Sequence, residues 1–77
     1  MPFTITEIKA YVSVDEGGEE GVCAMLGNDG MWLPMICADD RRLGLLRPLA
    51  EQLAKSTGKP IKVLRFSQRE EVEVIQP

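Results

Sequence analysis

Residues 31–38 limit the possible folds of this chain more than any other stretch, because they are eight consecutive residues without a charge. They read Met-Trp-Leu-Pro-Met-Ile-Cys-Ala. Successive side chains of an extended strand point to opposite faces, so this run presents apolar groups on both sides of a sheet. Because the whole chain has only 77 residues, one small domain must find cover for both faces.

The size and composition predict a single domain over residues 1–77. Apolar residues make up 44 % of the chain, which is enough for a core. A single core of this size supplies only a few kcal/mol, so self-association, disulfides or a metal often assist such domains. The chain contains no histidine, which removes the commonest zinc ligand and the commonest acid–base catalyst. We therefore expect no metal and no cofactor.

The charge pattern disfavours nucleic acid as a partner, since the net charge is −3 and the pI is near 4.8. Residues 1–40 carry eight acidic side chains against Lys9, a net charge of −7, whereas residues 41–77 have a net charge of +4. Two such poles suit the orientation of a partner or of a second copy, or they form two ordinary solvated faces. No apolar run approaches the roughly 20 residues of a membrane span, and no signal peptide is apparent. We expect a cytoplasmic protein with no membrane partner.

Three strands are predicted before the first helical pattern. Residues 5–14 alternate in polarity as a strand does. The glycine pair Gly17-Gly18 predicts a turn into a second strand at residues 22–26, and residues 27–30 (Gly-Asn-Asp-Gly) predict a turn into a third at 31–38. With two-residue loops at Gly17-Gly18 and at 28–29, Val12 lies opposite Cys23, and Met25 lies opposite Trp32. Pro34 cannot donate to a ladder, so the third strand should have an edge or a bulge there.

A helix is predicted after Asp39, which is a good N-cap, with Asp40 complementing the helix dipole. Leucines recur at helical spacing, and Gly58 followed by Pro60 marks the helix end. Pro48 lies inside this helix, where its ring presses on the carbonyl of residue 44, so we expect a kinked or two-part helix.

The last part of the chain predicts one strand, followed by a segment with two alternatives. Residues 61–66 read as a strand. Residues 67–70 (Ser-Gln-Arg-Glu) match a capping box that opens one helical turn, or they form a turn into a strand at 72–75, which we favour. The predicted fold class is α+β, a small antiparallel sheet in the order β-β-β-α-β(-β) with one kinked helix on one face.

One helix covers one face of such a sheet, so the other face needs a different cover. We place Ile8, Ala10, Val12, Cys23, Met25, Trp32 and Ile36 under the helix. The opposite face then exposes Tyr11, Val22, Ala24, Leu26, Met31, Leu33 and Met35. A monomer rarely exposes so large an apolar patch, and a second copy is the usual cover, so we predict a homo-oligomer with these seven residues at its interface. The alternative is a sheet that curls into a barrel.

Candidate reactive and binding residues are few. In the predicted register Cys23 and Cys37 lie on opposite faces, so we expect two packing thiols without a disulfide or metal. Arg65 and Arg69 are the best candidates for binding a small anion, or they form ion pairs with nearby glutamates.

The proline at position 2 suggests one more specific activity. Removal of Met1 would leave Pro2 as an N-terminal secondary amine, which resembles the catalytic base of small oligomeric tautomerases. The element order differs from that family, in which the first strand leads directly to a helix.

A wider pattern of the chain resembles small uncharacterised bacterial proteins of the integron or mobile gene cassette type. The segments that carry the resemblance are Tyr11-Val-Ser-Val-Asp15, Glu20-Gly-Val-Cys-Ala24, Leu33-Pro-Met-Ile36, Leu46-Arg-Pro-Leu49 and Arg65-Phe-Ser-Gln-Arg-Glu70. The resemblance implies a bacterial cytoplasmic origin and self-association, and it supplies no activity or functional residue.

Three functions follow as hypotheses from these observations. The first is a non-enzymatic, self-associating protein-interaction domain, with a further protein partner possible. The second is a small-ligand-binding protein or enzyme with a site at a subunit boundary, in its sharpest form a tautomerase that uses Pro2. The third is an acidic antagonist or antitoxin that binds a basic protein through the negative residues 15–20.

Overall fold

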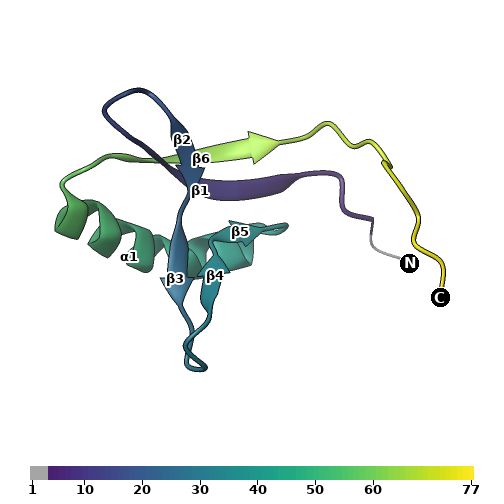
Figure 1. The fold of residues 1–77 in the computed structure, drawn as a ribbon, viewed down its shortest axis with the longest axis horizontal. Helices are drawn as coiled ribbons and strands as arrows, with labels where there is room; N and C mark the ends of the chain where they lie inside the picture. The colour runs from purple at the N-terminus through teal and green to yellow at the C-terminus, as the bar shows by residue number, and fades with distance from the viewer. Residues whose placement is uncertain (1–3) are drawn as a thin grey trace.

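The protein has an α+β fold, and the computed structural model describes residues 4–77 (Figure 1). Pro2 lies outside the described residues. The elements in chain order are β1 (Ile8–Val14), β2 (Glu20–Val22), β3 (Ala24–Leu26), β4 (Trp32–Pro34), β5 (Ile36–Cys37), α1 (Asp40–Thr57) and β6 (Ile61–Phe66). The predicted second and third strands are therefore each divided in two. No helix among residues 4–77 has both the length and the apolar character needed to cross a membrane.

Strand β1 is the centre of the main sheet, and all of its pairings are antiparallel. On one edge it pairs with β6, from Ile8 opposite Phe66 to Ser13 opposite Ile61. On the other edge it pairs with two short strands in succession, β5 beside its first half and β2 beside its second half. Strands β3 and β4 form a separate two-stranded hairpin, which projects away from the β1–β6 pair in Figure 1.

Both hairpins close through three-residue loops, and the predicted two-residue loops are therefore wrong. The N–H of Asp15 donates to the carbonyl of Glu19 at 3.0 Å, and the N–H of Gly27 donates to the carbonyl of Met31 at 2.7 Å. The last loop residue in each case is a glycine with positive φ, 85° at Gly18 and 81° at Gly30. A turn that ends in a left-handed residue is the usual three-residue hairpin connection, and it requires glycine at that position.

The longer loops shift the strand register by one residue. Val12 lies opposite Val22, and Met25 lies opposite Leu33. Because side chains alternate between faces, a shift of one residue exchanges the two faces of a strand. The predicted assignment of β1 residues to the two faces of the sheet is therefore wrong, since Tyr11 and not Val12 lies under the helix.

A ring of three backbone hydrogen bonds joins the sheet to the projecting hairpin. The N–H of Cys23 donates to the carbonyl of Tyr11 at 2.8 Å, that of Met35 donates to Cys23 at 2.8 Å, and that of Tyr11 donates to Met35 at 3.1 Å. Strand β2 gives way to β3 at Cys23, and β4 gives way to β5 at Met35. The predicted irregularity at Pro34 is confirmed, since β4 ends at that residue.

Helix α1 begins and ends as predicted. The Asp39 carboxylate accepts a hydrogen bond from the N–H of Arg42 at 2.7 Å, and Gly58 adopts the left-handed conformation with φ 70°. The helix continues without interruption through Pro48, so the two-part alternative is wrong. Its buried residues Leu46 and Ala50 pack against the sheet.

The core lies between α1 and one face of the sheet. It is made of Tyr11, Cys23, Met35, Leu46 and Ala50, with Met25, Leu43, Leu53 and Ile61 packed around them. The predicted final strand is not formed, because residues 67–77 contain neither helix nor strand. In Figure 1 this segment (yellow) continues beyond the end of β6 and leaves the sheet.

Candidate interaction surface

The face of the sheet that points away from α1 is apolar and open to solvent. Cα partners in antiparallel strands share a face, so the register places apolar residues together on it. This surface, the open face, has the apolar residues Ile8, Ala10, Val12, Val22, Ile36, Leu64 and Phe66, and the register also places Val14, Glu20 and Lys62 on it. Ala10 and Val12 form its floor and are buried, and Leu64 is partly buried. The side chains of Ile8, Val22, Ile36 and Phe66 are between one third and one half exposed, with Phe66 at 51 %.

A shallow hollow on the open face confirms that these strands share one surface. Its volume is about 130 Å³, and it is lined by Val12, Glu20, Gly21, Val22, Leu64 and Phe66. Small floor residues with larger apolar residues at the rim allow another apolar surface to approach closely. The one helix among residues 4–77 packs on the opposite face, around Tyr11.

The β3–β4 hairpin adds a second exposed apolar surface. Trp32 is 69 % exposed, Met31 62 % and Leu26 60 %. Between this hairpin and the second half of α1 lies a hollow of about 480 Å³, whose lining includes Trp32, Leu49 and Leu53. Exposed tryptophan and methionine are typical of contact surfaces rather than of ordinary solvated surface.

The structure corrects the predicted interface at two of its seven positions. Tyr11 and Met35 lie in the core under α1, with exposures of 3 % and 1 %, and they are not on the outer face. The cause is the one-residue register shift described above. Among the others, Val22 lies on the open face, while Ala24, Leu26, Met31 and Leu33 belong to the β3–β4 hairpin and its loop.

The residues predicted to lie under the helix are corrected in the same way. Cys23 and Met25 do pack with the core. Ile8, Ala10, Val12 and Ile36 lie on the open face, and Trp32 is exposed on the hairpin.

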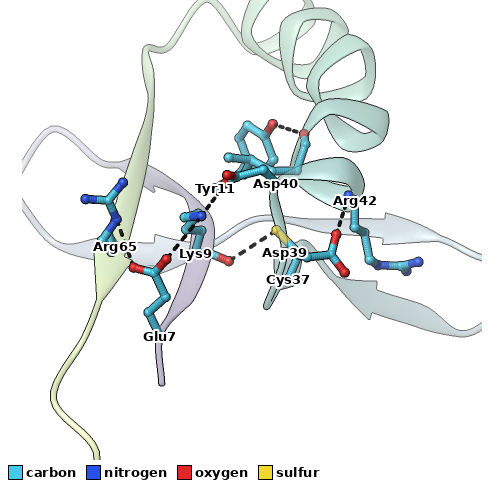
Figure 2. A network of polar contacts seen from close by, with 9 residues as sticks. Glu7, Lys9, Tyr11, Cys37, Asp39, Asp40, Arg42 and Arg65 are labelled. Atoms are coloured by element: carbon cyan, nitrogen blue, oxygen red, sulfur yellow. Dashed lines mark hydrogen bonds and ion pairs between the residues drawn. The ribbon is translucent and has the colours of Figure 1, made fainter. Parts of the chain in front are cut away.

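Arg65 and Arg69 have different surroundings. The Arg65 guanidinium pairs with the Glu7 carboxylate at 3.1 Å (Nε to Oε2), as Figure 2 shows. Arg69 borders a shallow hollow of about 250 Å³, together with residues near the start of β1 and with Gln68 and Glu70. The ion-pair alternative therefore applies to Arg65.

A buried lysine links β1 to the start of α1, and the sequence prediction did not identify this role. Lys9 is 6 % exposed, and its ammonium contacts the Asp40 carboxylate and, at 3.5 Å, the Glu7 carboxylate (Figure 2). The hydrogen bond to Asp40 raises the pKa of Lys9 and lowers the pKa of Asp40. Two carboxylates compensate the charge of this buried ammonium, and the contact with Asp40 holds the start of α1 against β1.

Both cysteines are free and buried, in agreement with the predicted packing role. The prediction that they lie on opposite faces is wrong, because Cys23 packs with Tyr11 in the core and Cys37 lies opposite Lys9, on the same face as Tyr11. The Cys37 thiol donates to the carbonyl of Lys9 with a sulfur–oxygen distance of 3.7 Å. Burial raises the pKa of both the Cys23 and the Cys37 thiols, which lowers their thiolate fraction and their reactivity at neutral pH. Within residues 4–77, no three acidic or cysteine side chains come close enough together to hold a metal ion.

Comparison of the chain with protein-family models, with curated proteins and with solved structures gave no match. The two exposed apolar surfaces are therefore the features from which a function is inferred.

Proposed function

We propose that this chain is a self-associating protein-interaction domain in which a second copy covers the open face. The observation that carries the proposal is the position of α1 on only one side of a sheet that is apolar on both sides. A sheet of this kind is stable when a second layer covers the remaining face, and the layer of a symmetric partner serves as well as a helix of the same chain.

The total surface area supports this proposal. The chain exposes 6666 Å², whereas a compact monomer of 8.5 kDa exposes about 4,700 Å² by the usual scaling with mass. The radius of gyration is 14.6 Å, against about 11.5 Å for a compact domain of this length. The excess of about 2,000 Å² per chain includes the extended residues 67–77 and the projecting β3–β4 hairpin as well as the open face, and it lies within the range that obligate homodimers bury.

Sedimentation equilibrium over a wide range of concentration tests the proposal. We expect a reversible dimer or higher oligomer whose population rises with concentration. Val22→Lys places a charge at a half-exposed position of the open face, where the monomer tolerates it. It should weaken self-association about tenfold or more, which corresponds to ~1.4 kcal/mol per tenfold.

The matched control is Leu45→Lys on α1, where the leucine is 66 % exposed and takes no part in the core. This variant should associate like the parent protein. A parent protein that remains monomeric at every concentration would refute the proposal, as would equal effects of the two lysine substitutions.

A further inference from the structure

The C-terminal segment, residues 67–77, has the pattern of a strand but no sheet to join. It contains Glu71-Val72-Glu73-Val74, and it is extended without any regular pairing. Val72 is 90 % exposed and Ile75 85 %. Alternation of valine and glutamate is typical of a strand with one buried and one solvated face, so this segment has an apolar side without a contact surface.

Strand β6 offers an edge that such a segment fits. Its six residues, Ile61–Phe66, pair with β1 along one side, and no strand from residues 4–77 lies along the other. An open edge presents unpaired N–H and C=O groups to any extended chain. The edge is basic, with Lys59 just before the strand, Lys62 on its open-face side, and Arg65, which already pairs with Glu7, on the other side. Residues 67–77 carry three glutamates against Arg69. The charges of the segment and the edge are therefore complementary.

The segment is poorly suited to fold back on the β6 of its own chain. A hairpin requires a turn after Phe66, and residues 67–77 contain no glycine, asparagine or aspartate. Where this chain does reverse direction, it uses glycines with positive φ, at Gly18 and Gly30. In Figure 1 the segment instead leaves the end of β6 on the side where β1 begins, which places it beyond the domain and within reach of a neighbour.

We propose that residues 70–75 pair as an added strand with the open edge of β6 in a second copy, so that two chains exchange their C-terminal segments. This inference rests on the proposed self-association. Val72 and Val74 then extend the open face beside Leu64 and Phe66. Glu71 and Glu73 lie on the opposite side of the sheet, the side of Arg65. Because this edge borders the open face, one partner copy covers both.

The test uses the full chain with Val72→Pro and Glu73→Pro combined. Of two adjacent residues in a strand, one directs its N–H toward the neighbouring strand, so this pair of prolines removes an N–H that the added strand needs. These residues make no regular pairing within the chain, so the fold of each domain should be retained. We expect self-association to weaken about tenfold or more, and the amides of β6 to lose their concentration-dependent protection from hydrogen exchange. Gln76→Pro, outside the paired segment, is the matched control and should change neither quantity.

Three outcomes separate this inference from the proposed function. If the parent chain does not associate, both fail. If it associates and the double proline variant associates equally well, the strand exchange is refuted while the open face remains as the interface. The third outcome comes from nuclear Overhauser contacts between the C-terminal segment and β6. They are measured in a mixture of labelled and unlabelled chains, which separates contacts between chains from contacts within one chain. Contacts between chains support the exchange, and contacts only within one chain overturn it.

Discussion

The backbone N–H of Met35 donates a hydrogen bond to the carbonyl oxygen of Cys23 at 2.8 Å. Each of these residues separates two short strands, so the bond joins the two points at which the chain passes from the main sheet to the projecting hairpin. Both side chains enter the core beside Tyr11, which completes the ring of backbone bonds. Packing at this junction therefore holds together three parts of the molecule, namely the sheet, the hairpin and α1.

Truncation of Met35 should destabilise the fold strongly. Met35 is 1 % exposed, and replacement of a buried methionine by alanine typically costs about 2–5 kcal/mol through lost burial and the cavity that remains. Urea unfolding of Met35→Ala measures this loss. Met31→Ala is the control, because Met31 is 62 % exposed and should change stability by less than about 0.5 kcal/mol. Similar values for the two variants would contradict the central position of Met35.

The sequence did not predict the strand register around this junction, and the reason lies in the side-chain pattern of β1 and the length of the loop that follows it. The side chains of β1 alternate between an aliphatic face with Val12 and a more polar face with Tyr11, and this alternation predicted Val12, not Tyr11, under the helix. The choice depended on loop length, and a loop with glycine at its third position was read as a two-residue turn. A single residue of loop length exchanged the faces of the whole strand.

Other features were local and therefore predictable. Asp39 and Gly58 determine the ends of α1 through side-chain and backbone geometry of their own. Counting apolar positions against one helix also predicted that one helix leaves apolar side chains of the sheet exposed, as the structure shows. The pairing of Lys9 with Asp40 joins residues 31 positions apart, so it depends on how the helix docks on the sheet and no local pattern predicts it.

Loss of the Tyr11 hydroxyl should have a moderate effect. The hydroxyl donates to the carbonyl oxygen of Leu43 at 2.6 Å, which joins β1 to the first turns of α1. Tyr11→Phe removes this bond and should lower the free energy of unfolding by about 0.5–1.5 kcal/mol. Urea unfolding at neutral pH is the measurement, and unchanged stability would show that the bond contributes nothing net.

Stability should also fall at alkaline pH. Burial raises the pKa of Cys23 and Cys37 above 9.0 and that of Tyr11 above 10.0. The folded state then binds these protons more tightly than the unfolded state, so stability is retained below pH 9 and decreases as pH rises above it. Unfolding midpoints measured across this range test the trend. Tyr11→Phe should remove the part that begins near pH 10.

The glycine inside α1 and the glycine that ends it should respond to alanine in opposite directions. Gly58 ends the helix with φ 70°, and alanine there should destabilise by about 1 kcal/mol because its side chain disfavours this conformation. Gly44 lies inside the helix, and a Cβ added there meets no atom within 4 Å. Gly44→Ala should therefore stabilise by about 0.5–1 kcal/mol. Thermal unfolding of both variants measures the contrast, and the same sign for both would contradict this account.

Removal of the Asp40 charge should change the acid dependence of stability. The hydrogen bond from Lys9 lowers the pKa of Asp40 below 3.8. A lowered folded-state pKa means that the stabilisation is present above pH 3.8 and is lost as pH falls through the lowered value. Asp40→Asn should therefore be less stable than the parent at pH 7, and the difference should narrow as the pH approaches 2. Asp29→Asn, in the exposed β3–β4 loop, is the control for loss of a carboxylate. If the stability difference between Asp40→Asn and the parent is the same at both pH values, the Lys9–Asp40 pair does not stabilise the docking of α1 on β1.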